Sequence, residues 1–196
     1  MTGPTPGEVR ETASLSTRAE ELAEWAAHPD AEVRAAVASN PAVAPRTLEE
    51  LTCDEDWRVR AAAAKNSATE SFWLGELTRD DDARVREVVA ANPGLASQDH
   101  ERVCGDDEAR VRAAAAANLA ASSTALDVAS QDRDWRVRAS VAANPVAPMV
   151  LVRTLATDED WRVRAAVASN PAAPSEVLAA LALDGDSGVR EAAQRP

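Results

Sequence analysis

The sequence of 196 residues is poor in aromatic residues and cysteine, and it contains no long apolar run. Tyrosine is absent, and aromatic residues make up only 3% of the chain. A membrane-spanning helix needs about 20 consecutive apolar residues, and no run approaches that length. The two cysteines, Cys53 and Cys104, make neither a disulfide framework nor a zinc site. These absences favour a soluble protein whose core consists mainly of Ala, Val and Leu.

A strict repeat of 26 residues runs through most of the chain. An acidic residue always stands three positions before a Val-Arg pair, and an asparagine stands seven positions after its valine in every copy but the last. Apolar residues follow fifteen and eighteen positions after the valine in most copies. Such a period is the signature of a stacked repeat protein. The Val-Arg pairs are Val33-Arg34, Val59-Arg60, Val85-Arg86, Val111-Arg112, Val137-Arg138, Val163-Arg164 and Val189-Arg190.

Each copy predicts two short helices. The first begins at the acidic residue, whose carboxylate can accept hydrogen bonds from the free amides of a helix start. It ends at the asparagine, which tolerates a left-handed cap and is followed by proline in four copies. The second helix is about two turns long, so α and 3₁₀ geometry are both compatible with it. Its expected N-caps are Ser71, Ser97, Ser123 and Ser175.

The alanine-rich first helices have no polar face, which is typical of buried helices. One copy cannot cover its own apolar surface, so stability must come from stacking on its neighbours. We expect residues 1–14 to form a flexible tail and residues 15–196 to form a single repeat solenoid. The solenoid would comprise a half-repeat cap at about 15–27, six full repeats at about 28–183 and a C-terminal half-repeat at 184–196.

The segment from Asp158 to Leu181 resembles the leucine-rich repeat variant family over nearly the whole family motif, and the resemblance extends over residues 19–196. It implies an all-α, right-handed α-solenoid of two-helix repeats, in which an α-helix alternates with a short α- or 3₁₀-helix. The resemblance also implies a bacterial source and a likeness to HEAT-type repeats. The period of 26 exceeds the family's typical one, which favours a fully α second helix. The chain lacks the cysteine-rich segment that binds an iron–sulfur cluster in one family member.

The arginine after each valine lies four residues beyond the acidic residue that opens the helix. This spacing predicts an ion pair within one helix, which would tie down the helix start. The alternative interpretation is a ladder of arginines that binds phosphate. An arginine in every copy favours the structural role.

A second series of arginines precedes the valines, and three of its members follow a tryptophan. By helical angle the tryptophan points away from the valine and the core. Exposed Trp-Arg pairs are common in binding hot spots, so this stripe is the predicted partner-binding site. The alternative is that each Trp packs over the turn of the adjacent copy. The stripe consists of Trp57, Arg58, Arg84, Arg110, Trp135, Arg136, Trp161 and Arg162.

Acidic turns separate the copies, and the net charge is -12. They lack the glycine and the distal glutamate of an EF-hand loop, so capping and solubility are their expected roles. Phosphate binding favours a positive surface, which argues against nucleic acid as the partner. The turns could instead attract a basic partner.

The sequence offers no catalytic constellation. His28 and His100 occupy different repeat positions and have no nucleophile and base around them. Cys53 and Cys104 are expected at the apolar edge of second helices as small buried residues. The scattered glycines form no phosphate-binding loop. We therefore expect no catalytic, cofactor-binding or metal-binding residues.

The leading hypothesis is a non-enzymatic scaffold that binds a protein or an extended peptide. A nucleic-acid-binding HEAT-like solenoid and a glycosylase-type solenoid enzyme remain alternatives. The residues Met1–Glu8 lack the basic and apolar stretches of a secretory signal, so the expected location is cytoplasmic. The copy at residues 85–110 has lost its leucine pair at His100 and Val103, and a bend, a partner contact and mere sequence drift are all open explanations.

Overall fold

The computed structural model describes residues 6–194, and every regular element in that range is an α-helix. The chain divides into two compact units, Met1–Ala96 and Ser97–Pro196. The division falls inside the degenerate copy, although the 26-residue period runs through it without a break. The expectation of a single repeat solenoid over residues 15–196 stays a prediction. The predicted all-α repeat fold is confirmed.

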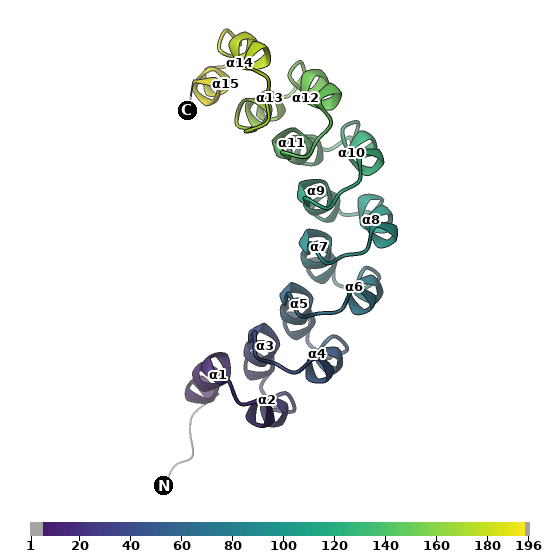
Figure 1. The fold of residues 1–196 in the computed structure, drawn as a ribbon, viewed down its shortest axis with the longest axis vertical. Helices are drawn as coiled ribbons and strands as arrows, with labels where there is room; N and C mark the ends of the chain where they lie inside the picture. Colours follow the sequence, from purple (N-terminus) through teal and green to yellow (C-terminus); the bar gives the residue numbers. More distant parts are fainter. Residues whose placement is uncertain (1–5, 195–196) are drawn as a thin grey trace. The chain divides into compact units, whose positions relative to one another are not determined.

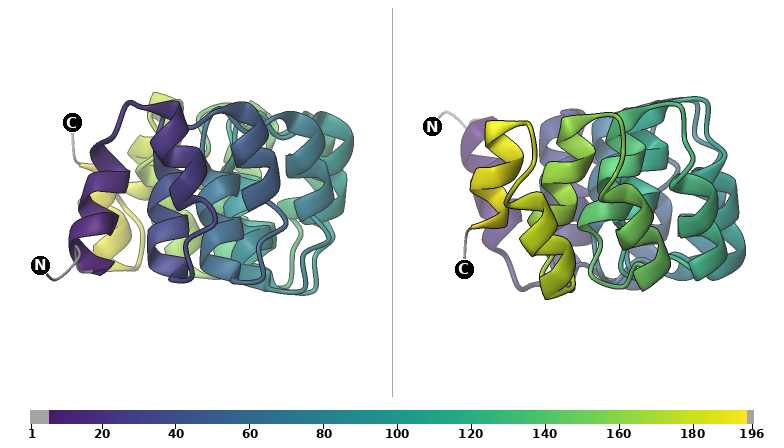
Figure 2. Two further views of the ribbon diagram at one scale, coloured as in Figure 1. Left: turned by 90° about the horizontal axis from the view of Figure 1, so that it is seen from below. Right: turned by 90° about the horizontal axis from the view of Figure 1, so that it is seen from above.

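Within its described residues 6–96, the first unit contains seven helices, which lie in two rows (Figure 1). The first helices of the copies pack side by side, and each second helix lies against first helices (Figure 2). The first helices are α1 (Pro6–Leu15), α3 (Ala31–Ser39), α5 (Trp57–Lys65) and α7 (Ala83–Ala91). The second helices are α2 (Ala19–Trp25), α4 (Pro45–Leu51) and α6 (Ser71–Leu77).

The second unit repeats this arrangement, with eight helices between residues 97 and 194, the part of it that the structure describes. Its first helices are α9 (Ala109–Ala117), α11 (Trp135–Ala143), α13 (Trp161–Ala168) and α15 (Ser187–Ala193). Its second helices are α8 (Ser97–Cys104), α10 (Ser123–Ala129), α12 (Met149–Leu155) and α14 (Ser175–Leu181).

The core of each unit forms between the two rows. The valine of each Val-Arg pair is fully buried, as Val59 and Val137 illustrate. The leucines of the second helices, such as Leu48 and Leu126, cover these valines from the other side. Alanines such as Ala142 fill the space between adjacent first helices, because small side chains allow a close approach. Stacking of apolar faces therefore stabilises the fold, as expected for repeats that cannot bury their surface alone.

The structure corrects the prediction of a flexible tail over residues 1–14. Residues 1–5 lie outside the described residues, but Pro6–Leu15 form helix α1, which packs on α3. Ala13 is fully buried there. The helix α1 thus takes the place of the first helix expected to be missing from the N-terminal half-repeat. It supplies apolar cover that α3 would otherwise lack.

The first helices α3 to α15 begin after the predicted acidic residues, and the aspartates among these accept the predicted cap hydrogen bond, whereas the side chain of Glu108 before α9 does not. The side chain of Asp134, for example, accepts a hydrogen bond from the amide of Arg136 at 2.9 Å. The second helices are all α-helical, which resolves the choice between α and 3₁₀ geometry. The prediction of their caps was wrong in detail, because the four serines are the first helical residues. The residue before Ser123, Ser122, does cap α10 by accepting from the amide of Ala125.

The asparagine that ends each first helix does not adopt the predicted left-handed conformation. Asn144 is extended, with φ −72° and ψ 118°, and no described residue other than glycine has a positive φ. Its side chain oxygen accepts from the amide of Val146, and its side chain amide donates to the carbonyls of Ala116 and Asn118 in the preceding copy. The asparagine therefore bonds one copy to the next. Asn40, Asn66, Asn92 and Asn170 donate to the preceding copy in the same way.

The degenerate copy still forms a second helix. In α8, His100 is only 2% exposed and takes the position that leucine has in other copies. Neither ring nitrogen has a hydrogen-bond partner among the described residues. Burial lowers the pKa of His100, while the nearby backbone of Ala115 acts in the opposite direction. An apolar position is thus occupied by a group that is poorly suited to it.

We expect His100→Leu to stabilise the protein by about 1–2 kcal/mol at neutral pH, because it removes two unpartnered buried nitrogens. The unfolded chain binds a proton at His100 near pH 6.5, whereas the folded chain resists it. Wild-type stability should therefore fall as the pH decreases through 6.5 towards the lower folded pKa, and the gain from His100→Leu should increase. Urea unfolding at several pH values between 5 and 8 measures both effects. An identical pH dependence in the two proteins would contradict this expectation.

The prediction of two buried cysteines was only partly right. Cys104, the last residue of α8, is half-buried, and burial raises the pKa of its thiol to about 11. Cys53 lies in the turn beyond the end of α4 and is exposed, because the helix already ends at Leu51. None of the helices described over residues 6–194 is long and apolar enough to cross a membrane.

Candidate functional site

In five of the seven Val-Arg pairs, the arginine bonds to a carboxylate of the next copy and not to the acidic residue at its own helix start. The guanidinium of Arg112 forms two hydrogen bonds to the carboxylate of Asp132, at 2.6 and 2.9 Å, twenty residues further on. Its remaining terminal nitrogen donates to the carbonyls of Asp106 and Asp107 in its own turn. The predicted pairing within one helix was wrong, because the side chain spans the gap between adjacent turns. The same pairs are Arg34–Asp54, Arg60–Asp80, Arg138–Asp158 and Arg164–Asp184.

These pairs also explain the acidic turns. Burial alone would raise the pKa of Asp132, but the hydrogen bond from Arg112 and that from the Asp134 amide lower it below its ordinary value. The first aspartate of the turn thus anchors the preceding copy, and the third caps the following helix. Within the described residues, no group of three or more His, Cys, Asp or Glu is arranged to hold a metal ion. The arginine series is engaged by carboxylates, which leaves little of it for phosphate.

The predicted Trp-Arg stripe starts the first helices of both units. In the first unit, the guanidinium carbon of Arg84 lies 3.5 Å from the ring centroid of Trp57, and that of Arg58 lies 5.2 Å away. Each arginine also pairs with the aspartate that caps its own helix, as Arg84 does with Asp82 at 2.6 Å. The tryptophan is therefore stacked between its own copy and the next.

The second unit contains the longer part of the stripe. The guanidinium of Arg162 lies 4.7 Å from the ring of Trp135 and 5.1 Å from that of Trp161. Arg136 lies 4.9 Å from Trp135, which is half-buried against the core. Trp161 is 43% exposed. Arg110 is exposed at the equivalent position of α9, where Ala109 replaces the tryptophan.

The stripe thus combines a structural and an exposed part. The packing of each Trp on the next copy, the alternative interpretation, is present for Trp57 and Trp135. The exposed faces of Trp161 and the arginines remain accessible on the first-helix row. Whether they bind a partner stays a prediction. Next to Trp135, a cavity of about 330 Å³ is lined mainly by small side chains of α9 and α11, including Ala117, Ala139 and Ala143.

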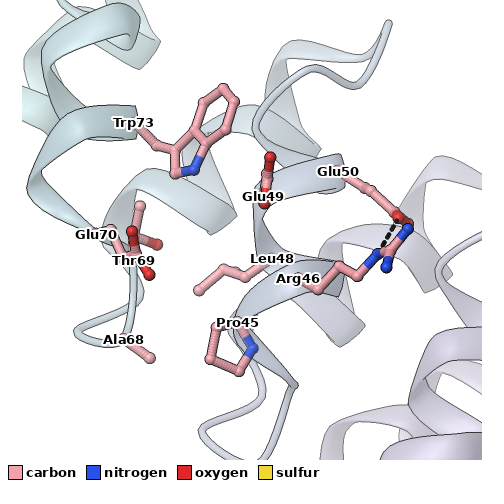
Figure 3. Close-up of a pocket in the computed structure, with 9 residues that line it drawn as sticks. All are labelled: Pro45, Arg46, Leu48, Glu49, Glu50, Ala68, Thr69, Glu70 and Trp73. Carbon is pink, nitrogen blue, oxygen red and sulfur yellow. Dashed lines mark ion pairs between the residues drawn. The ribbon is translucent and has the colours of Figure 1, made fainter.

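A second cavity, of about 390 Å³, lies between α4 and α6 in the first unit (Figure 3). Trp73 forms one of its walls, and Glu49 and Glu70 line it. Sequence reasoning missed this site. Its signal is that Trp73, together with the neighbouring Phe72, is aromatic at second-helix positions where no other copy has an aromatic residue.

Comparison with known proteins agrees with this repeat architecture. Residues 161–186 match the model of the family described as leucine rich repeat variant. Among solved structures, the chain is similar to one described as a leucine-rich repeat variant with a novel repetitive protein structural motif. The sequence identity is 27% and the TM-score 0.66, and the similarity covers 97% of this chain and 76% of that one.

Two further solved structures show weaker similarity. One is an engineered protein at 18% identity and a TM-score of 0.44, with 95% of this chain and 72% of that chain covered. The other is a designed armadillo repeat protein at 16% identity and a TM-score of 0.38, with 98% and 93% covered. No curated protein matches the chain.

The segment that matches the family contains one full period of the repeat that recurs along the chain every 26 residues. The Arg-Asp and Asn bonds join its neighbours in the same way throughout each unit. The resemblance drawn from the sequence is therefore confirmed: one repeat matches the model of the leucine-rich repeat variant family, and the fold is similar to that of a solved leucine-rich repeat variant.

Proposed function

We propose that the chain is a non-enzymatic scaffold that binds another protein or an extended peptide along the exposed faces of its first helices. Repeat proteins of this architecture keep a constant frame and vary exposed positions to select a partner. Here the Val, Arg, Asp and Asn positions form the frame, since their side chains join adjacent copies. The tryptophan position varies between Trp and Ala from copy to copy and is Ser187 in the last one.

The observation that carries this proposal is the stacked group of Trp135, Arg162 and Trp161 in the second unit. Its aromatic and guanidinium faces are held in fixed positions by stacking, which reduces the entropy lost on binding. Tryptophan and arginine are also the residues most enriched among binding hot spots. The neighbouring cavity of about 330 Å³ beside Ala139 offers room for a small apolar side chain of the partner.

The charges of the stripe favour a protein over a nucleic acid. Arg58, Arg136 and Arg162 each lie within 3.5 Å of the carboxylate that caps their own helix. These pairs reduce the positive field that phosphate groups would need. A partner that offers both apolar contacts and hydrogen-bond acceptors fits the surface better.

We expect the double variant Trp57→Ala with Trp161→Ala to weaken binding of the partner at least tenfold, because each truncation removes a large aromatic contact. The partner is first identified by affinity capture on the wild-type chain, and its affinity for both proteins is then measured by calorimetry. The matched control is Val128→Ala, which truncates an exposed apolar side chain on α10. Unchanged affinity in the tryptophan variant, with the fold intact by circular dichroism, would show that the stripe is the wrong surface.

A further inference from the structure

The cavity between α4 and α6 combines an aromatic wall with two carboxylates. Its base is apolar, because the fully buried side chain of Leu48 points into it and Pro45 lies at its edge (Figure 3). Trp73 lies at the opposite end, and Glu49 and Glu70 lie on its sides.

Neither carboxylate has a structural role in the fold. Glu70 precedes α6 as its N-cap, yet its side chain accepts no cap hydrogen bond. Within residues 6–194, the side chains of Glu49 and Glu70 take part in no hydrogen bond or ion pair. Arg46 and Glu50 also line the cavity, but they pair with each other at 3.7 Å, so Arg46 compensates Glu50 and neither Glu49 nor Glu70 (Figure 3). The cavity therefore contains uncompensated negative charge.

The repeat frame does not require these residues either. The position of Trp73 is occupied in other copies by small, aliphatic or acidic residues. The position of Glu70 is occupied by Ala, Ser or Pro in the other full copies and by Arg18 in the N-terminal half-repeat. Both departures occur in the same copy and face the same space. A feature that only one copy carries is explained better by a ligand than by stacking, which all copies share.

We propose that this cavity binds the lysine or arginine side chain of an extended segment of a partner protein. The inference rests on the proposed peptide-binding function but uses the second-helix row, a surface separate from the Trp-Arg stripe. The aliphatic part of the side chain would lie on Leu48 and against the Trp73 ring. Its charge would lie between the two carboxylates, where it gains both ion pairing and a cation–π contact.

The chemistry of the whole chain favours a cationic ligand. The net charge is -12, so a basic segment is attracted before contact is made. The volume of about 390 Å³ is near the lower end of the range for ligand sites and suits a single long side chain. An acidic or uncharged side chain would leave Glu49 and Glu70 uncompensated.

The test uses the full chain and blocked pentapeptides of the form Ala-Ala-X-Ala-Ala, with lysine, arginine or norleucine at X. Binding is followed by NMR through the indole N–H signal of Trp73, which Trp73→Phe identifies by its disappearance. We expect saturable shifts with the lysine or arginine peptide up to about 10 mM, and none with norleucine, which has the length of lysine without its charge. The double variant Glu49→Gln with Glu70→Gln should weaken binding at least tenfold.

The matched control is Glu76→Gln, which removes one exposed carboxylate from the same helix outside the cavity. It should leave the affinity close to that of the wild type, whereas an equal loss in this variant would show only a general attraction to the acidic surface and overturn the proposal. The absence of a saturable shift, or equal binding of norleucine, would also overturn it. Tighter binding of tetramethylammonium than of the lysine peptide would exclude a peptide side chain as the ligand.

The result is independent of the stripe. The variant Trp57→Ala with Trp161→Ala should bind the lysine peptide as the wild type does. If the lysine peptide does not bind but the stripe variant weakens partner binding, only the inference about the cavity is wrong. If the lysine peptide binds but the stripe variant leaves partner binding unchanged, the proposed binding surface moves to the second-helix row.

Discussion

Replacing Arg112 by methionine is expected to destabilise the second unit by about 2–4 kcal/mol, a large share of the stability of a domain of this size. The side chains of Arg112 and Asp132 are only 9% and 12% exposed. Methionine retains much of the apolar stem but leaves the carboxylate of Asp132 buried without its two charged donors. The carbonyls of Asp106 and Asp107 lose their donor as well. Urea unfolding followed by circular dichroism measures the loss.

The control for this prediction is Arg153→Met, which breaks an exposed pair between adjacent second helices. Arg153 and Glu176 are 53% and 57% exposed, so water replaces the lost partner and the effect should be much smaller. Adding Asp132→Asn to Arg112→Met should restore part of the lost stability, because it removes the uncompensated charge. Equal losses for Arg112→Met and Arg153→Met would contradict the role assigned to the inter-repeat pairs.

The pair of Arg112 and Asp132 shows which structural features can be predicted from the sequence and which cannot. The positions of the helices follow from the period, because each Val-Arg segment lies between an acidic start and an asparagine end. The partner of Arg112 does not follow, since the four-residue spacing rule treats each helix as isolated. Stacking brings the next turn closer to the guanidinium than the helix's own first residue. The first residue of the turns is aspartate in six of seven copies, such as Asp132, and this was a signal that a carboxylate of fixed length is needed there.

In the candidate site, too, some features could be predicted from the sequence and others depend on how the copies stack. The exposure of Trp161 could be predicted from helical angles, because it depends only on the direction of a side chain relative to the buried valine. The stacking of Trp57 under Arg84 needs the distance between copies, which one sequence does not contain. The cavity beside Trp73 depends on two helices that are 26 residues apart in the period. A search for residues that depart from the repeat, rather than those that obey it, would have found Trp73.

The second large effect is expected for Asn144→Ala, which should lower the stability of the second unit because this asparagine bonds one copy to the next. The side chain amide of Asn144 donates to the carbonyls of Ala116 and Asn118 at 2.8 and 3.2 Å, and its oxygen accepts from the amide of Val146 at 3.0 Å. The two bonds to carbonyls are buried and the bond from the Val146 amide is partly buried, so alanine leaves these groups without the partner they have in the wild type. Each unsatisfied buried group costs about 1 kcal/mol or more, which gives an expected loss of about 2–4 kcal/mol.

Hydrogen exchange distinguishes this loss from a general weakening of helix α11. The amide of Val146 should exchange faster in Asn144→Ala, because its acceptor is the asparagine side chain itself. The matched control is Ser169→Ala at the end of α13, where the exposed hydroxyl donates only within its own helix, to the carbonyl of Ala165. If both variants lost the same small amount of stability, the asparagine would act only as the end of its helix. A loss of stability confined to Asn144→Ala would show that the side chain amide of this asparagine holds its copy to the preceding one.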